Sequence, residues 1–278
     1  MLLIFNSVAH FLTDAVCAAA LFGPVLASGG DFSAAVIIYN TAAFTTQCLV
    51  GLATDRLRRH EGLAALGLAV CALGALLPLP GPVLALVVGL GNSLFHVAGG
   101  TVTLKGAKDA GPLGVFVAPG AVGLALAVAV RAIGGCAVDF PWKTGAAMSM
   151  LAAAFVFAGK SLGGYVCRGL GASRTALFSI PLAAVLTAFC FTWAAPSLAG
   201  QLLLNLSMPV TLWLMYSAMP ESPGFAFGLA ASALYPGTVA GGMISLTGAW
   251  RALLVLVCFA AGLAAIIYSD KKITEVQK

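Results

Sequence analysis

The sequence predicts an all-α integral membrane protein with about ten transmembrane helices, from its composition, its apolar runs and its length. Of the 278 residues, 61% are hydrophobic and 8% are charged, whereas soluble domains average about 25% charged residues. The mean hydropathy is +1.04. The apolar runs are continuous rather than alternating, which favours helices over the strands of an outer-membrane barrel. One span with a tight loop takes about 25–30 residues, so no room remains for a soluble domain.

Ten apolar segments follow one another, separated by Gly, Pro and charged residues. They cover residues 2–27, 33–53, 62–80, 82–104, 112–133, 143–166, 175–194, 197–218, 223–246 and 250–268. The first segment lacks a basic start and contains His10 and Asp14, which a signal peptide would avoid. We therefore expect a five-span N-terminal bundle over 1–133, a five-span C-terminal bundle over 143–268, and a tail over 269–278.

The distribution of Lys and Arg predicts the orientation in the cell membrane. If the N-terminus is cytoplasmic, ten of the 14 basic residues fall on the cytoplasmic side, three fall outside, and Lys160 lies within a span. Positive charge accumulates in cytoplasmic loops, so we expect a multi-pass protein with both termini and the tail in the cytoplasm. The net charge of +5 then reflects topology, and we expect no nucleic-acid partner.

A weak internal repeat links the two halves of the chain. GLATDRLRRH closes the second segment and GGYVCRGLGASR closes the sixth. In both, a Gly lies four residues before the position occupied by Asp55 or Cys167, and an Arg follows. The fifth and ninth segments also contain similar stretches, APGAVGLAL at residues 118–126 and YPGTVAGG at residues 235–242. The repeat pairs spans two to five with spans six to nine, and many secondary transporters are built from repeated halves.

The stretch from Gly51 to His60 resembles the loop between the second and third helices of the major facilitator superfamily, whose pattern is roughly G-x-L-x-D-R-x-G-R-R. Asp55, Arg56 and Arg59 match this pattern, and Arg58 stands where the family usually has Gly. Members of that superfamily have twelve transmembrane helices, so the resemblance implies that this chain lacks the sixth and the seventh.

Two further stretches resemble the fosmidomycin-resistance branch of that superfamily, which exports drugs against protons. They are HFLTD, from His10 to Asp14, and GNSLFH, from Gly91 to His96. Val97 and Ala98 stand where that branch usually has Pro-Glu. The resemblance implies a secondary transporter of a small organic solute that is coupled to protons.

A carboxylate among arginines at a helix end is typical of a cytoplasmic latch that opens and closes as the two halves rock. We expect a gating loop made of Asp55, Arg56 and Arg59, with Arg168 at the equivalent position of the repeat. The alternative is a solvated basic loop that only sets the topology.

The first segment carries a pair of residues suited to proton exchange. At 100° per residue its polar side chains fall on one narrow arc: Asn6, His10, Thr13, Asp14 and Cys17. A carboxylate near the bilayer centre costs about 2.5–3.5 kcal/mol even on the mild insertion scale, so Asp14 needs a cavity or a partner. We expect Asp14, with His10 one turn before it, to carry the proton. The alternative is a structural His–Asp hydrogen bond without turnover.

Other polar side chains within the apolar segments are candidates for binding the solute. We expect this role for Asn6, Asn40, Gln47, Asn92, His96, Gln201, Asn205 and Tyr216. Each of them could instead serve as a hydrogen bond between packed helices. Asn92 and His96 share one face of their helix with small residues, which allow close approach of a neighbour.

Several classes of function have no support in the sequence. No phosphate-binding loop or dinucleotide fingerprint appears, and no hydrolase arrangement stands out, so we expect neither an enzyme nor a cofactor. We expect no metal, although His10, Asp14 and His96 are residue types that suit divalent ions. The remaining rivals are a membrane scaffold that keeps the fold and an intramembrane enzyme. Association of two chains is left open.

Overall fold

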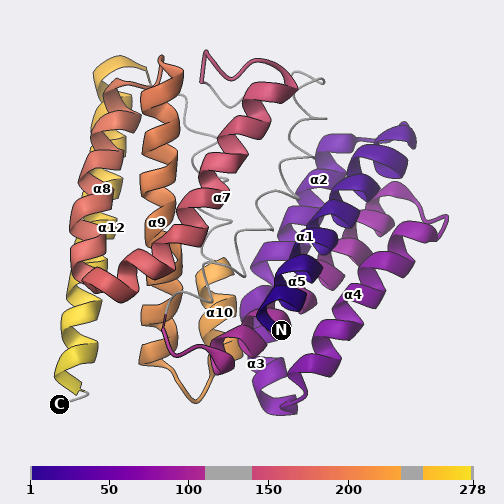
Figure 1. Ribbon diagram of the computed structural model, residues 1–278. Coiled ribbons are helices and arrows are strands. Elements are labelled where there is room, and N and C mark those ends of the chain that lie inside the picture. Colours follow the sequence, from indigo (N-terminus) through magenta and orange to yellow (C-terminus); the bar gives the residue numbers. More distant parts are fainter. Residues whose placement is uncertain (1, 110–139, 233–246, 277–278) are drawn as a thin grey trace. The chain divides into compact units, whose positions relative to one another are not determined.

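A computed structural model describes residues 2–109, 140–232 and 247–276, and every regular element in these ranges is helical (Figure 1). The elements are α1 (Leu2–Ala20), η1 (Leu21–Val25), α2 (Phe32–Asn40), η2 (Thr41–Thr45), α3 (Gln47–Leu57), α4 (His60–Leu76), α5 (Gly81–Gly106), α7 (Gly145–Leu170), α8 (Ala172–Phe189), α9 (Ala194–Ala218), α10 (Pro223–Ser232) and α12 (Gly248–Val276). The predicted all-α class is confirmed for these residues.

The helices have the length and composition of membrane spans. Among the described residues, six are long and apolar enough to cross a bilayer, and a seventh is added if α2, η2 and α3 count as one span bent by 40°. The fifth predicted segment (112–133) and the end of the ninth (233–246) lie outside the described residues. The prediction of ten spans and the prediction of a pseudo-repeat therefore stay predictions.

The chain divides into two compact units. One unit joins Met1–Gly106 with Met219–Met243, and the other joins Ala107–Ala218 with Ile244–Lys278. The apolar segments of the sequence predict a single division between 133 and 143. In the structure, by contrast, α10 packs with the helices of the first half.

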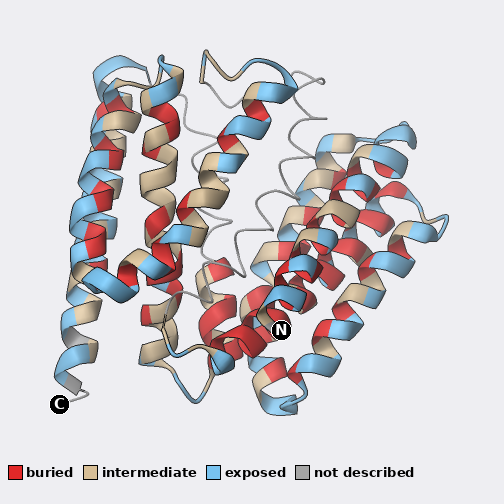
Figure 2. Cartoon of the chain, in the orientation of Figure 1, coloured by how far each residue is buried: buried red, intermediate tan, exposed pale blue. Residues whose placement is uncertain are grey.

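In the first unit α5 is the central helix, packed against α1, α2, α3, α4 and α10. Small residues make these contacts close. A Cβ on Gly67 of α4 would lie 2.5 Å from the backbone nitrogen of Phe95 on α5, so only glycine allows the two helix backbones this separation. Figure 2 shows buried residues concentrated where these helices face one another. The chemistry-bearing residues of α5 are therefore held in a rigid, buried setting.

In the second unit α7 and α8 pack against α9, and α8 also packs against α12. Glycines again set the distance between helices. A Cβ on Gly159 or Gly163 would lie 2.3 Å from the carbonyl oxygen of Leu202 or Leu206 on α9. Glycines thus allow close helix packing in this unit, as they do in the first.

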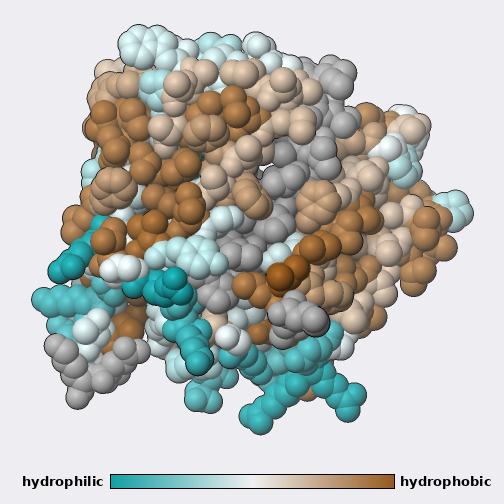
Figure 3. Space-filling model, viewed as in Figure 1, coloured by the Kyte–Doolittle hydropathy of each residue, from teal (hydrophilic) through white to brown (hydrophobic). Residues whose placement is uncertain are grey.

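Large apolar side chains cover the outer faces of the helices. Leu49 is 69% exposed, Leu66 51%, and Leu76 81%, and the space-filling view shows extended hydrophobic areas (Figure 3). A protein in water rarely presents so much apolar surface, whereas lipid covers it at no cost. The surface thus agrees with the membrane interpretation of the composition.

Two helices of the first unit run into π-helical turns: η1 follows α1, and η2 follows α2. Pro24 lies inside η1, where its missing N–H breaks the regular hydrogen-bond ladder. The second π-helical turn, η2, ends at Thr45, and the hydroxyl of the next residue, Thr46, donates to Ser93 Oγ on α5 at 2.7 Å. Such turns are frequent at functional sites, and both adjoin the helices that carry the cluster described below.

Candidate functional site

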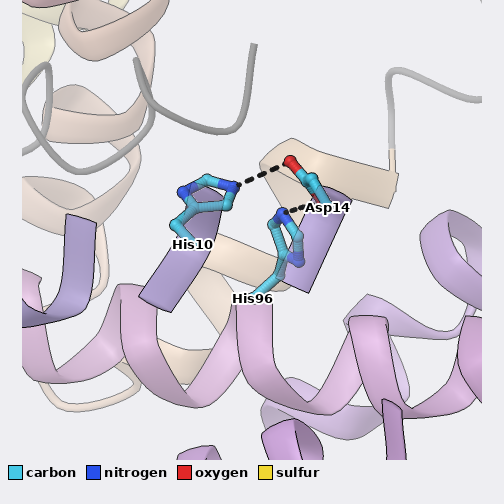
Figure 4. Close-up of side chains that lie close together, drawn as sticks. All are labelled: His10, Asp14 and His96. Atoms are coloured by element: carbon cyan, nitrogen blue, oxygen red, sulfur yellow. Dashed lines mark ion pairs between the residues drawn. The ribbon is translucent and has the colours of Figure 1, made fainter. Parts of the chain in front are cut away.

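A buried cluster of three ionisable side chains joins α1 to α5 (Figure 4). His10 and Asp14 lie one turn apart on α1, are 4% and 3% exposed, and approach to 3.5 Å between His10 Nε2 and Asp14 Oδ2. The i, i+4 spacing along a helix explains this approach. Both residues are therefore withdrawn from the lipid, as the cost of a charge in the bilayer demands.

α5 contributes the third member and an amide beside it. His96 Nε2 lies 3.6 Å from Asp14 Oδ1, and the amide nitrogen of Asn92 donates a hydrogen bond to the same oxygen at 3.1 Å. The rings of His10 and His96 meet edge to face, with centroids 4.3 Å apart. Asp14 thus stands between two imidazoles, each facing a different carboxylate oxygen.

The backbone of α5 fixes which nitrogen of His96 carries its hydrogen. Nδ1 lies 2.9 Å from the carbonyl oxygen of Asn92. A carbonyl oxygen only accepts, so Nδ1 carries the hydrogen and donates it. In the neutral ring Nε2 then presents a lone pair toward the carboxylate oxygen of Asp14. Two acceptors facing each other repel, so the arrangement requires a cation between them, either a proton or a metal ion.

The polar cluster continues inward to a pair of thiols. The Asn92 amide nitrogen also lies 3.8 Å from Cys17 Sγ, and Cys17 Sγ lies 3.7 Å from Cys71 Sγ on α4. Both thiols contact the carbonyl oxygen of Val88. The helical arc in the sequence already includes Cys17, but no spacing signals Cys71, because it joins from another helix.

Three other predicted binding residues in this unit contact protein groups or lie part-buried. Asn6 donates to Thr103 Oγ1 on α5 at 3.4 Å, which is the packing role that the sequence left open. The Gln47 amide nitrogen donates to the carbonyl of Ala43, while its oxygen is buried and has no hydrogen-bond partner among the described residues. Asn40 is part-buried at the end of α2.

The remaining predicted binding residues belong to α9 in the second unit and are part-buried. The Asn205 amide donates to the carbonyl oxygen of Gln201 at 2.8 Å. The ring of Tyr216 packs near that of Trp213, with centroids 5.9 Å apart. Each unit therefore carries its own set of polar residues within apolar helices.

Asp55 of the predicted gating loop caps a helix from far along the chain. Its two carboxylate oxygens accept hydrogen bonds from the backbone N–H groups of Gly224 and Phe225, each at 2.8 Å. These are the first free donors of α10, because Pro223 at its start has no N–H. A carboxylate at a helix N-terminus also interacts favourably with the helix dipole. Asp55 therefore holds α3 and α10 together.

The arginines of the predicted gating loops lie at the surface. Arg56 and Arg59 are exposed. In the second unit Arg168 Nη1 lies 3.6 Å from Asp109 Oδ2. The sequence repeat does not reveal Asp109 as the partner of Arg168, since it lies 59 positions earlier in the chain.

Comparisons with known protein families and with curated proteins find no match for this chain. His10, Asp14 and His96 each offer a ligand atom, and these atoms lie within 4.8 Å of one another. Among the described residues they form the group that could hold a metal ion.

Proposed function

We propose that this chain is a proton-coupled secondary transporter of a small organic solute, of the major facilitator type, shortened to ten spans. The observation that carries the proposal is the Asp14 carboxylate, buried between two imidazoles in an apolar helix pair. An ionisable group at such a position marks an ion or substrate pathway by default.

The cluster can take up and release a proton through small movements. A proton between Asp14 and His96 satisfies both acceptors, and His10 provides a second position on the opposite carboxylate oxygen. The protonated and unprotonated clusters differ by one charge. Because an apolar environment disfavours a charged group, the two forms are stabilised by surroundings of different polarity. When the proton and the solute are bound and released in the same alternating-access cycle, proton flow drives solute transport.

The contact between Asp55 and α10 provides the gate in this proposal. It joins the end of α3 to a helix from the second half of the sequence through two charge-assisted hydrogen bonds. Such a contact can break and re-form as a unit. In the cell membrane we expect both termini on the cytoplasmic side, so a topology reporter fused after Lys278 should read as cytoplasmic.

The test compares the wild-type protein with Asp14→Asn in proteoliposomes. Small organic compounds that raise the melting temperature of the purified protein are added outside vesicles that contain a pH-sensitive dye. The wild type should change the internal pH. Asp14→Asn should fold and still bind the compound but give no pH change, because an amide does not exchange a proton in this range.

Asp31→Asn is the matched control, since Asp31 is an exposed acid that caps α2 by accepting from the backbone of Ala34. It should transport as the wild type does. If Asp14→Asn moves protons with an unchanged pH profile, the assignment of the proton to Asp14 is wrong. If no compound produces a pH change in the wild type, the transport proposal is contradicted and a scaffold role is favoured.

A further inference from the structure

We propose that His10, Asp14 and His96 form a binding site for one divalent transition-metal ion of the Zn²⁺ class, which takes the place of the proton in the cluster. The proposal goes beyond the function proposed above, because it rests on the geometry of the cluster and not on transport. It concerns the gap between the carboxylate of Asp14 and the two imidazoles that face it (Figure 4).

The distances in the cluster fit a coordination sphere better than a hydrogen-bonded network. His10 Nε2 lies 3.5 Å from Asp14 Oδ2, and His96 Nε2 lies 3.6 Å from Asp14 Oδ1, whereas N–H···O hydrogen bonds are about 2.7–3.2 Å long. A tetrahedral site with metal–ligand bonds of about 2.0–2.1 Å has ligand atoms about 3.3–3.4 Å apart. The two imidazoles face different carboxylate oxygens, but one ligand atom from each residue can be chosen so that all three lie within 4.8 Å of one another. An ion bound through one of these oxygens would draw the three atoms closer together.

The donor atoms are those that a zinc-class ion prefers. Two imidazole nitrogens and a carboxylate oxygen bind Zn²⁺ and related ions. They are less suitable for soft metal ions that prefer thiolate ligands, and for Ca²⁺. His96 is in the tautomer that a ligand needs, since its Nδ1 hydrogen bonds the Asn92 carbonyl and leaves Nε2 free to coordinate. A histidine that binds metal usually donates its other N–H in this way.

The second shell of the site is already in place. The Asn92 amide nitrogen donates to Asp14 Oδ1 at 3.1 Å and orients the carboxylate. The other end of that amide, Asn92 Oδ1, is buried without a hydrogen-bond partner among the described residues. Three protein ligands leave a fourth coordination position open to water, and a metal-bound water is a donor of the kind that this oxygen lacks.

The site has one accessible edge. The side chain of His96 is 13% exposed, whereas those of His10 and Asp14 are 5% and 3% exposed. His96 is therefore the member of the cluster that an approaching ion would meet first. When it binds, the coordinating groups must be deprotonated, and any proton in the cluster passes to water as the metal–ligand bonds form.

The experiment measures Zn²⁺ binding to the purified full chain in detergent, carrying no polyhistidine tag and stripped of metal. Binding is followed by competition with a chromophoric indicator at pH 7. We expect one ion per chain. His10→Gln and His96→Gln should each weaken binding about tenfold or more, since even the loss of a second-shell group costs 10- to 100-fold.

His60→Gln is the matched control, because the chain has three histidines and His60 lies at the start of α4, outside the cluster. It should bind Zn²⁺ as the wild type does. Co²⁺ gives an independent readout, since a tetrahedral site produces strong visible absorption that His96→Gln should abolish. The melting temperature of each variant without metal shows whether it is folded.

The proposal is overturned if the wild type does not bind Zn²⁺, or if folded His10→Gln and His96→Gln bind as tightly as His60→Gln. The outcomes separate it from the transport proposal. Proton transport that depends on Asp14 without Zn²⁺ binding contradicts only the metal site. Zn²⁺ binding at the cluster without any solute-driven proton movement contradicts only the transporter.

Discussion

Asp55 accepts a hydrogen bond from the backbone of Gly224, 169 residues further along the chain, and its second oxygen bonds the next residue. The contact is tight on both sides. A Cβ on Gly224 would lie 2.5 Å from Thr54 Oγ1 and 2.7 Å from Asp55 Oδ1. Glycine at 224 is therefore what lets α10 begin against the carboxylate.

Replacing Asp55 should destabilise the protein in proportion to the bonds lost. Asp55→Asn keeps one acceptor oxygen and should lower the free energy of unfolding by about 1 kcal/mol, and Asp55→Ala by about 2 kcal/mol, the range measured for helix caps. Equilibrium unfolding in detergent checks this order. At the exposed cap of α2, Asp31→Asn keeps an oxygen that can accept the one hydrogen bond from Ala34, and Asn caps helices about as well as Asp, so it should cost less than Asp55→Asn. Equal losses at the two positions would contradict the role given to Asp55.

Adding a methyl group between α3 and α10 should force the two helices apart. A Cβ on Gly51 would lie 2.3 Å from the carbonyl oxygen of Gly224, and one on Gly228 would lie 2.1 Å from that of Gln47. Backbone atoms cannot yield, so Gly51→Ala and Gly228→Ala should each lower the unfolding free energy by about 1–3 kcal/mol.

Gly62 on α4 provides the control for this pair. A Cβ there would have no atom within 4 Å, so Gly62→Ala should stabilise the helix by about 0.4–1 kcal/mol through the unfolded state. Melting temperatures should thus move in opposite directions. A loss of stability at Gly62 equal to that at Gly51 would show that the effect is not one of helix contact.

Arg58→Gly should stabilise the protein. Arg58 has φ of 54° at the end of α3, a left-handed conformation that costs a residue with a Cβ about 1–2 kcal/mol. Glycine adopts it freely, so we expect a gain of about 1 kcal/mol in the free energy of unfolding. Arg59→Gly, at a φ of −115°, should give no gain.

Stability should fall at acidic pH because of His60, which precedes the apolar part of α4 and lies outside the spanning segments. Burial lowers the pKa of His60 from 6.5, and the charge of Lys105 lowers it further, while Asp55 and Glu61 act in the opposite direction. The unfolded chain then binds the proton more readily than the folded one. The contribution of neutral His60 is present above pH about 6.5 and is lost as the pH falls below it.

His60→Gln should flatten this dependence. Unfolding is measured from pH 5 to pH 8 for both proteins, and the difference between them should change mainly below pH 6.5. His60 Nδ1 is buried without a hydrogen-bond partner among the described residues, so the substitution removes no hydrogen bond at that atom. Parallel pH curves for the two proteins would show that other groups cause the loss.

Local contacts within one helix could be predicted from spacing. His10 and Asp14 are four positions apart, and their side chains lie 3.5 Å apart. Asn92 and His96 have the same spacing on α5, and their contact at 2.9 Å runs from the His96 ring to the Asn92 carbonyl. These results follow from 3.6 residues per turn, which any helix imposes on its sequence.

Contacts between helices could not be predicted in the same way. The approach of Cys17 to Cys71 joins two helices at positions that no period relates, and Arg168 of α7 meets Asp109, which lies beyond the end of α5. Asp55 was expected to act among the neighbouring arginines, but its oxygens bond the start of α10. Such pairs depend on which helix faces are small enough to meet, as the glycines of α3 and α10 are.

The sequence by itself determined the class of this protein, because a chain so rich in apolar residues can satisfy its backbone in lipid only by forming helices. It also determined which residues share a face of each helix, since that depends on the helical period alone. The tertiary structure decided which faces meet. It brought a carboxylate from α1 between two imidazoles and an aspartate from α3 to the start of α10, because only packing of small residues across helices sets those distances.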